Sequence, residues 1–131
     1  MTLTLAVRTP EGLLYEGPVR SIRAEDLDGG FGILPGRRDL AAVLPVGLVL
    51  FEDDAGDGFM AVSGGVLELT AGRCRVMAPK AALARDPDDA ASALGALRAA
   101  REARTGRRRG VLADLEREAL RRLAHAMRER A

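Results

Sequence analysis

The sequence contains few of the side chains that form active sites and metal centres. Its 131 residues include one cysteine, Cys74, and one histidine, His125, with no tryptophan and 3% aromatic residues. One cysteine and one histidine cannot supply the ligands of a zinc centre, and a single cysteine cannot form an internal disulfide. None of the three serines, Ser21, Ser63 and Ser92, stands in a nucleophile elbow. The sequence therefore predicts a chain with no catalytic activity of its own, no metal and no cofactor.

Long apolar runs are also missing. No stretch approaches the roughly 18 apolar residues of a membrane-spanning helix, and residues 1–3 begin a strand pattern without the regions of a signal peptide. These absences predict a cytoplasmic protein. Arginines flank Cys74 in a segment with strand character, so we expect a buried or half-buried thiol rather than a reactive one.

The formal net charge of +1 combines two parts of opposite charge. Residues 1–80 carry 8 basic and 11 acidic side chains, whereas residues 81–131 carry 12 basic and 8 acidic ones. The basic side chains of the second part are arginines, which favour planar pairing with carboxylates or phosphates. The second part is therefore a candidate for binding an acidic partner.

Nucleic-acid or general protein binding by a small basic-tailed module is the alternative function that this composition leaves open. Carboxylates interrupt the basic patch, and no aromatic side chain is present there to stack on bases. We therefore expect no nucleic-acid partner, and retention on a DNA or RNA column would test this. The patch comprises Arg98, Arg101, Arg104, Arg107, Arg108 and Arg109.

Short strand patterns dominate the first 80 residues. Leu3, Leu5 and Val7 alternate with other residues, as on one face of a half-buried strand. Glycine and proline separate further short apolar segments, which predicts an antiparallel β-sandwich of about ten short strands. A turn is expected at residues 45–47, and a bulge or close backbone approach at residues 64–65. The strand segments include residues 3–8, 13–15, 19–24, 40–44, 48–52, 59–62, 66–69 and 73–78.

Two glycine-containing segments resemble ligand-binding loops but lack essential parts of them. Residues 29–36 (GGFGILPG) do not follow a strand and open a helix, as a dinucleotide-binding fingerprint requires, so we expect a shaped loop leading into a short strand. Residues 53–58 place Asp53, Asp57 and Gly58 at calcium-loop positions, but the acidic ligand at position twelve is replaced by Gly64. A polar hairpin tip is the better interpretation.

After residue 80 the sequence becomes helical in character. Asp86 and Pro87 suit a helix cap and first turn. Apolar residues at steps of three and four predict helices over residues 90–104 and 111–128, with a connection at residues 105–110. The chain should thus be an α+β protein, with a sandwich over residues 1–80 and a C-terminal antiparallel α-helical hairpin over residues 81–131. His125 is expected on a helix surface or between helices.

Four motifs occur in an order and spacing that resemble the epsilon subunit of bacterial rotary F-type ATP synthases. They are residues 15–19 (YEGPV), 29–36 (GGFGILPG), 44–47 (LPVG) and 63–68 (SGGVLE). The resemblance covers nearly the whole chain. Residues 30–35 and the acidic hairpin after Phe51 look closer to the alternate, N-type ATPase branch.

The resemblance implies a non-catalytic central-stalk subunit. Its sandwich would bind the gamma subunit and the c-ring, and its C-terminal helices would reach the catalytic alpha and beta subunits and hinder ATP hydrolysis. It implies a peripheral location on the cytoplasmic face of the bacterial inner membrane, with membrane contact only through the complex. The implied interface with gamma and the c-ring comprises Asp28, Gly30, Phe31, Gly32, Leu34, Arg37 and Arg38, and the implied regulatory arm Arg101, Arg104, Arg108, Arg117, Arg121 and Arg122.

The sequence departs from the family at positions that matter for these contacts. Family members often carry an acidic residue where this chain has Gly30, and His-Ala-Pro where it has Arg37-Arg38-Asp39. Polar contacts therefore do not transfer unchanged. Some members bind ATP through a motif with an arginine at the position of Ala91, so we expect no useful ATP binding here.

Overall fold

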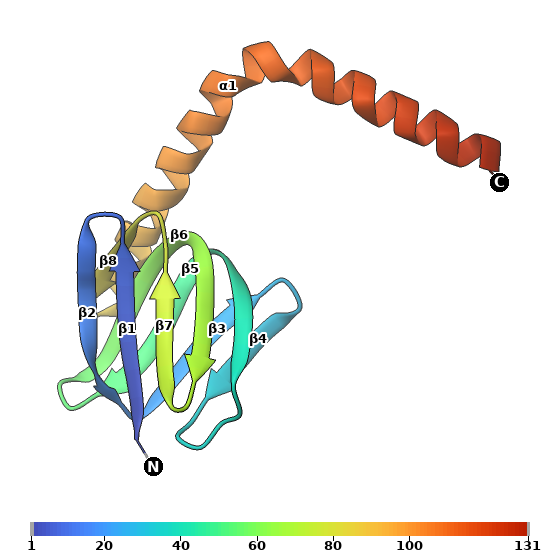
Figure 1. Cartoon of the computed structure of the whole chain (residues 1–131). Coiled ribbons are helices and arrows are strands. Elements are labelled where there is room, and N and C mark those ends of the chain that lie inside the picture. The colour runs from blue at the N-terminus through green and yellow to red at the C-terminus, as the bar shows by residue number, and fades with distance from the viewer. Residues whose placement is uncertain (1, 131) are drawn as a thin grey trace. The chain divides into compact units, whose positions relative to one another are not determined.

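A computed structural model describes residues 2–130, with side chains described for residues 2–104 and 121–124. Eight strands precede one helix in this part of the chain (Figure 1). The chain divides into two compact units, Met1–Arg98 and Ala99–Ala131. The elements are β1 (Leu3–Thr9), β2 (Gly12–Val19), β3 (Ser21–Asp26), β4 (Gly29–Ile33), β5 (Leu40–Asp53), β6 (Gly56–Thr70), β7 (Arg73–Met77), β8 (Ala81–Ala84) and α1 (Pro87–Arg130).

The two longest strands, β5 and β6, belong to both layers of the sandwich. Residues 66–70 of β6 pair with β7, which continues the sheet through β1 to β2. Residues 59–62 of β6 pair instead with β8, and residues 50–52 of β5 pair with β3, which pairs with β4. Figure 1 shows these long strands connecting the two layers.

The prediction of about ten short strands is wrong because it divided β5 and β6. Leu44 pairs with Gly65 and Val46 with Ser63, so Pro45 and Gly64 oppose each other at the one unpaired step of a long ladder. Pro45 has no N–H to donate, which is why this step is unpaired. Gly64 adopts a φ of 97°, and both strands continue beyond the unpaired step without separating. A Cβ on Gly65 would overlap the Met77 carbonyl oxygen, which confirms the predicted close backbone approach.

The sandwich is not wholly antiparallel, because β1 and β7 pair in parallel. The core contains aliphatic side chains from both layers, as the low aromatic content requires. The prediction for Leu3, Leu5 and Val7 is confirmed, since all three are buried, and so is the prediction of a buried Cys74. Truncating one of these large side chains to alanine should cost about 2–5 kcal/mol.

Two predicted boundaries differ from the structure. Residues 29–32, expected as a loop leading into a short strand, already belong to strand β4, because Gly30 and Gly32 pair with Glu25 and Arg23 of β3. The sandwich also extends beyond residue 80, because β8 pairs with β6 through Ala81–Val62 and Ala84–Phe59. This strand is short and mostly alanine, so its composition resembled the helical segment that follows it.

Helix α1 begins as predicted. The Asp89 N–H donates to Asp86 Oδ1 at 2.9 Å, and the Ala90 N–H donates to the Asp86 carbonyl at 3.1 Å. The structure has one helix to Arg130 instead of a helical hairpin with a connection at residues 105–110. Threonine and glycine each cost only about 0.5–1 kcal/mol inside a helix, and no proline follows Pro87. Within the described residues, α1 is too polar to cross a lipid bilayer.

Candidate functional site

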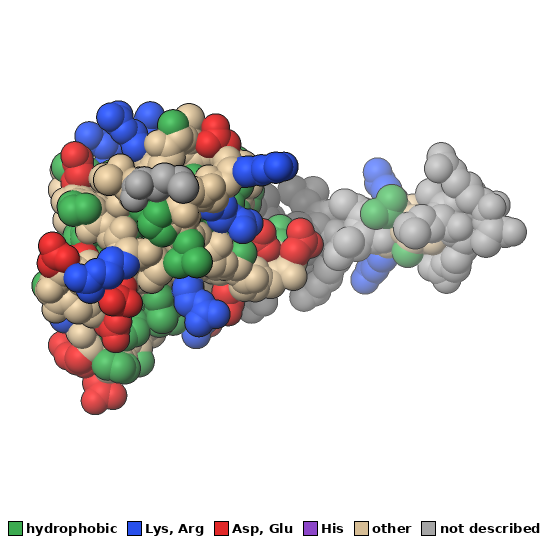
Figure 2. Space-filling model, turned by 90° about the horizontal axis from the view of Figure 1, so that it is seen from below, with side chains coloured by type: hydrophobic (Ala, Val, Ile, Leu, Met, Phe, Trp, Pro, Cys, Tyr) green, Lys and Arg blue, Asp and Glu red, His purple; other side chains and the backbone are tan. Residues whose placement is uncertain are grey.

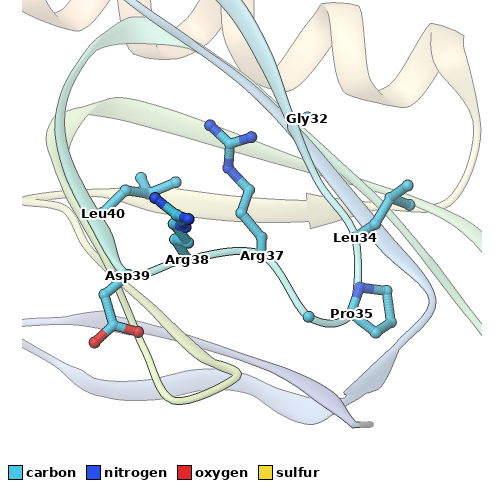
Figure 3. A pocket seen from close by; sticks show the side chains of 8 residues that line it. Gly32, Leu34, Pro35, Arg37, Arg38, Asp39 and Leu40 are labelled. Carbon is cyan, nitrogen blue, oxygen red and sulfur yellow. The ribbon is translucent and has the colours of Figure 1, made fainter.

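The loop between β4 and β5 borders an open cavity of about 520 Å³. The Arg37 N–H donates to the Leu34 carbonyl at 3.1 Å, and Gly36 adopts a φ of 91°, so residues 34–37 form a tight turn. Asp39 Oδ1 accepts the Ala71 N–H at 3.0 Å, which ties the end of the loop to the turn between β6 and β7. Figure 3 shows the lining residues, which are Gly32, Leu34, Pro35, Gly36, Arg37, Arg38, Asp39 and Leu40.

The cavity includes four of the seven residues predicted for the gamma and c-ring interface. Gly32, Leu34, Arg37 and Arg38 line it, and the Leu34 side chain is 64% exposed. Figure 2 shows this end of the sandwich from below, with basic, acidic and hydrophobic side chains interspersed. Because the lining combines apolar Leu34 with basic Arg37 and Arg38, the loop offers mixed contacts at this end of the sheet.

The other three predicted interface residues lie away from this cavity. Gly30 pairs with Glu25 near the opposite end of β4, and half-buried Phe31 packs against the core. Asp28 lies in the turn between β3 and β4, where its N–H donates to Asp26 Oδ1 at 2.8 Å. Strand β4 therefore separates the predicted interface into two regions.

A row of exposed side chains crosses the outer face of one layer, and the sequence analysis did not identify it. Val43 of β5 pairs with Val66 of β6, which pairs with Met77 of β7, and the row continues to Arg8 and Leu13. The exposed fractions are 61% for Val43, 42% for Val66, 46% for Met77 and 47% for Leu13. We call these five residues the outer row. Four of its five members are apolar, as expected of a surface that a partner covers.

A second undetected cluster lies at the hairpin between β5 and β6. Arg85 donates from both terminal nitrogens to the two carboxylate oxygens of Asp53, each at 2.9 Å, and the Tyr15 hydroxyl donates to Asp53 Oδ2 at 2.7 Å. The Arg85 guanidinium lies 5.5 Å from the centre of the Phe51 ring, and that ring lies 4.6 Å from the Tyr15 ring. A Cβ on Gly58 would overlap the Phe51 ring, so glycine leaves the space that the ring occupies.

These contacts change the acidity of the cluster. The Arg85 hydrogen bonds, followed by the Tyr15 hydrogen bond, hold the pKa of Asp53 well below its ordinary value. Burial and the contact with Asp53 raise the pKa of Tyr15 to about 12. The predicted hairpin tip is present, but Asp53 is an ion-pair partner rather than a solvated tip residue. No metal-binding group of acidic, histidine or cysteine side chains occurs in the described part of the chain.

Four of the six predicted arm residues have described side chains. Arg101, Arg104, Arg121 and Arg122 are exposed. The side chains of Arg108 and Arg117 lie outside the described residues, as does that of His125. The exposure of these four arginines is compatible with the predicted arm. The partner of the arm stays a prediction.

Comparison with protein families gives a match that covers the sandwich. Residues 2–84 match the family described as "ATP synthase, Delta/Epsilon chain, beta-sandwich domain". The match covers β1 to β8 and ends before the helix.

Curated relatives carry the same family name. The chain is 47% identical over 92 residues to "ATP synthase epsilon chain 2" of Cereibacter sphaeroides, with 65% of this chain and 63% of the relative covered. It is 36% identical over 87 residues to "ATP synthase epsilon chain" of Anoxybacillus flavithermus, with 66% and 65% covered. The chain thus spans slightly less than two thirds of the length of these relatives.

Solved structures share the fold. One is the mitochondrial ATP synthase of Euglena gracilis, with a TM-score of 0.58, 23% identity, and 75% of this chain and 64% of that chain covered. Another is the central stalk and c-ring of the Tetrahymena thermophila mitochondrial ATP synthase, with a TM-score of 0.51, 18% identity, and 63% and 66% covered.

Proposed function

Because the chain belongs to the ATP synthase delta/epsilon family, as the match over residues 2–84 shows, we propose that it is the non-catalytic epsilon subunit of a rotary F-type ATP synthase. In this role it joins the gamma subunit to the c-ring and couples rotation to ATP synthesis or hydrolysis. The observation that carries the proposal is a family-matched sandwich whose exposed features are an apolar outer row and a basic loop. Both are surfaces for protein partners.

The outer row supports gamma as the partner of one face. Val43, Val66 and Met77 lie side by side on three neighbouring strands, so a partner can bury all three with one surface. Covering apolar area is worth about 25 cal/mol per Å², and the rigid sheet loses little entropy on binding. The gamma subunit therefore covers this face in the assembled stalk.

The loop at residues 34–39 supports the c-ring as the partner at the end of the sandwich. Leu34 is exposed, and Arg37 and Arg38 extend from a tight turn held by the Asp39 contact with Ala71. Asp28 lies in the turn at the other end of β4, so the loop at residues 34–39 makes the main ring contact without it. Membrane contact then occurs only through the complex, at the cytoplasmic face of the bacterial inner membrane.

The basic helix supports a regulatory role for the arm. Arg101, Arg104, Arg121 and Arg122 are exposed on α1 and suit acidic surfaces of the catalytic alpha and beta subunits. In the assembled enzyme the arm hinders ATP hydrolysis. The assignment to the N-type branch stays a prediction.

Deletion of the gene from the complete ATPase operon tests the proposed function. Membrane vesicles with the full enzyme should build a membrane potential on addition of ATP, reported by a potential-sensitive dye. Vesicles that lack this chain should hydrolyse ATP with little or no potential, and adding back the purified chain should restore it. An unchanged ATP-driven potential without the chain would overturn the proposal.

A further inference from the structure

The loop between β4 and β5 carries two arginine side chains that form no ion pair among the described residues. Figure 3 shows the Arg37 side chain extending upward from the loop and the Asp39 carboxylate pointing the other way, with Arg38 between them seen nearly end-on. Asp39 is also engaged elsewhere, because its Oδ1 accepts the Ala71 N–H. Asp39 is the one carboxylate in the lining and forms no ion pair with Arg37 or Arg38 in the described part of the chain, so the cavity keeps an excess of one positive charge.

The chemistry of this cavity favours one carboxylate over an extended polyanion. A guanidinium presents parallel N–H donors that match the two oxygens of a carboxylate. Nucleic acids and anionic membranes spread their charge over a large area, and residues 1–80 carry a net charge of −3 that opposes such surfaces. Exposed Leu34, at the edge of the same cavity, adds an apolar contact that suits a protein loop.

Gly32 leaves the space that such a side chain needs. A Cβ there would meet only the Ile22 carbonyl oxygen, at 3.9 Å, which is an ordinary contact. Strand β4 therefore tolerates a side chain at this position, but the chain has none. The cavity stays open beside the two arginines.

We propose that this cavity receives a carboxylate side chain from a polar loop of the cognate c-ring, bound by Arg37 and Arg38 with Leu34 packing at its edge. This inference rests on the proposed function and names the chemistry of its ring contact. Because the chain carries arginines at these positions, the pairing selects a ring whose loop supplies an acid. The contact is electrostatic and weakens as salt shortens the Debye length from about 8 Å.

Binding of the complex of this chain with gamma to the cognate c-ring in neutral detergent tests the inference. The double variant Arg37→Ala/Arg38→Ala should lower ring affinity about tenfold or more at low salt. Gly32→Val, which fills the cavity and keeps both charges, should also weaken binding. Lys80→Ala removes an exposed cation in the segment between β7 and β8 and should bind as the wild type does.

Two results would overturn the inference. One is wild-type ring affinity in both the double-alanine and Gly32→Val variants. The other is that the double variant loses binding to phosphatidylglycerol vesicles while keeping its ring affinity, since the arginines would then contact lipid. The membrane-potential assay tests the proposed function separately from these two binding results. If either binding result occurs and vesicles with the double-alanine variant still build an ATP-driven potential, the inference fails and the proposed function stands.

Discussion

Arg85 is fixed to Asp53 by two parallel hydrogen bonds, Nη1 to Oδ1 and Nη2 to Oδ2, each of 2.9 Å. Arg85 directly precedes Asp86, which caps α1, so this pair attaches the base of the helix to the hairpin between β5 and β6. Ala90, in the first turn of α1, is also buried. Any rearrangement of the arm in the assembled enzyme should therefore begin beyond these residues.

Replacing Arg85 with alanine should lower the melting temperature by several degrees. The Asp53 side chain is only 11% exposed and would lose both charge-assisted hydrogen bonds. Arg20→Ala is the matched control, because Arg20 pairs with Glu52 and Asp54 on the surface, where such pairs contribute about 0–1 kcal/mol. Thermal unfolding followed by circular dichroism measures both. An equal, small shift in the two variants would contradict this role of Arg85.

The gap in melting temperature between wild type and Arg85→Ala should depend on pH, because Arg85 and Tyr15 lower the pKa of Asp53 in the folded state. Stability from a lowered carboxyl pKa is fully present above the unfolded value, about 3.9, and is lost as pH falls through the folded value. The gap in melting temperature between wild type and Arg85→Ala should thus be constant near neutral pH. It should narrow in melts below about pH 4, and a gap that widens there would contradict the assignment.

Cys74 should not react with iodoacetamide in the folded protein. Its side chain is buried, and burial raises the pKa of the thiol to about 12, so little reactive thiolate exists at pH 8. Mass spectrometry after alkylation should show slow modification in native buffer and complete modification in guanidinium chloride. Native modification at the rate of a free thiol would show that β7 opens readily.

Local sequence patterns predicted where strands occur better than they predicted which strands are continuous and which strands pair. The alternation of Leu3, Leu5 and Val7 identifies a buried face because each strand has a period of two. Pro45 and Gly64 resemble turn residues by local chemistry, and only the register of β5 against β6 shows that they oppose each other within one ladder. The parallel pairing of β1 and β7 likewise joins segments about seventy residues apart.

The site could be predicted only where its residues are consecutive. Leu34, Arg37 and Arg38 lie in one short segment, so the predicted interface already contained half of the cavity lining. The outer row depends on the registers of five strands, and no local pattern shows that Val66 lies between Val43 and Met77. Asp53 likewise lies in an acidic run, and nothing near it in the sequence indicates that Arg85, 32 residues away, is its partner.

Removing the arm after Arg98 should raise ATP hydrolysis by the assembled enzyme at low salt without releasing gamma. The truncation keeps Arg85, the Asp86 cap and buried Ala90, so the sandwich retains its helix contacts. It removes Arg101, Arg104, Arg121 and Arg122 together with the rest of the arm. High salt should reduce the inhibition by the full-length chain. Unchanged hydrolysis at low salt would leave the arm with a structural role only.

ATP should bind the isolated chain with a dissociation constant weaker than about 1 mM, or roughly −4 kcal/mol. Ala91 occupies the place of the arginine in the ATP-binding motif of some family members, so the guanidinium contact with ATP is missing. Isothermal titration calorimetry with magnesium–ATP measures this. Saturable binding at micromolar concentrations would contradict the prediction.

The most direct test of the central-stalk assignment is the amount of gamma recovered with this chain after coexpression and affinity purification. Wild type should recover gamma in equal proportion. Val66→Lys, in the middle of the outer row, should lose most of it while keeping its own melting temperature, because Val66 is 42% exposed. Thr70→Lys, exposed on the same strand but outside the row, should recover gamma normally. Failure of the wild-type chain to recover gamma would contradict the assignment, and normal recovery by Val66→Lys would show that gamma binds elsewhere.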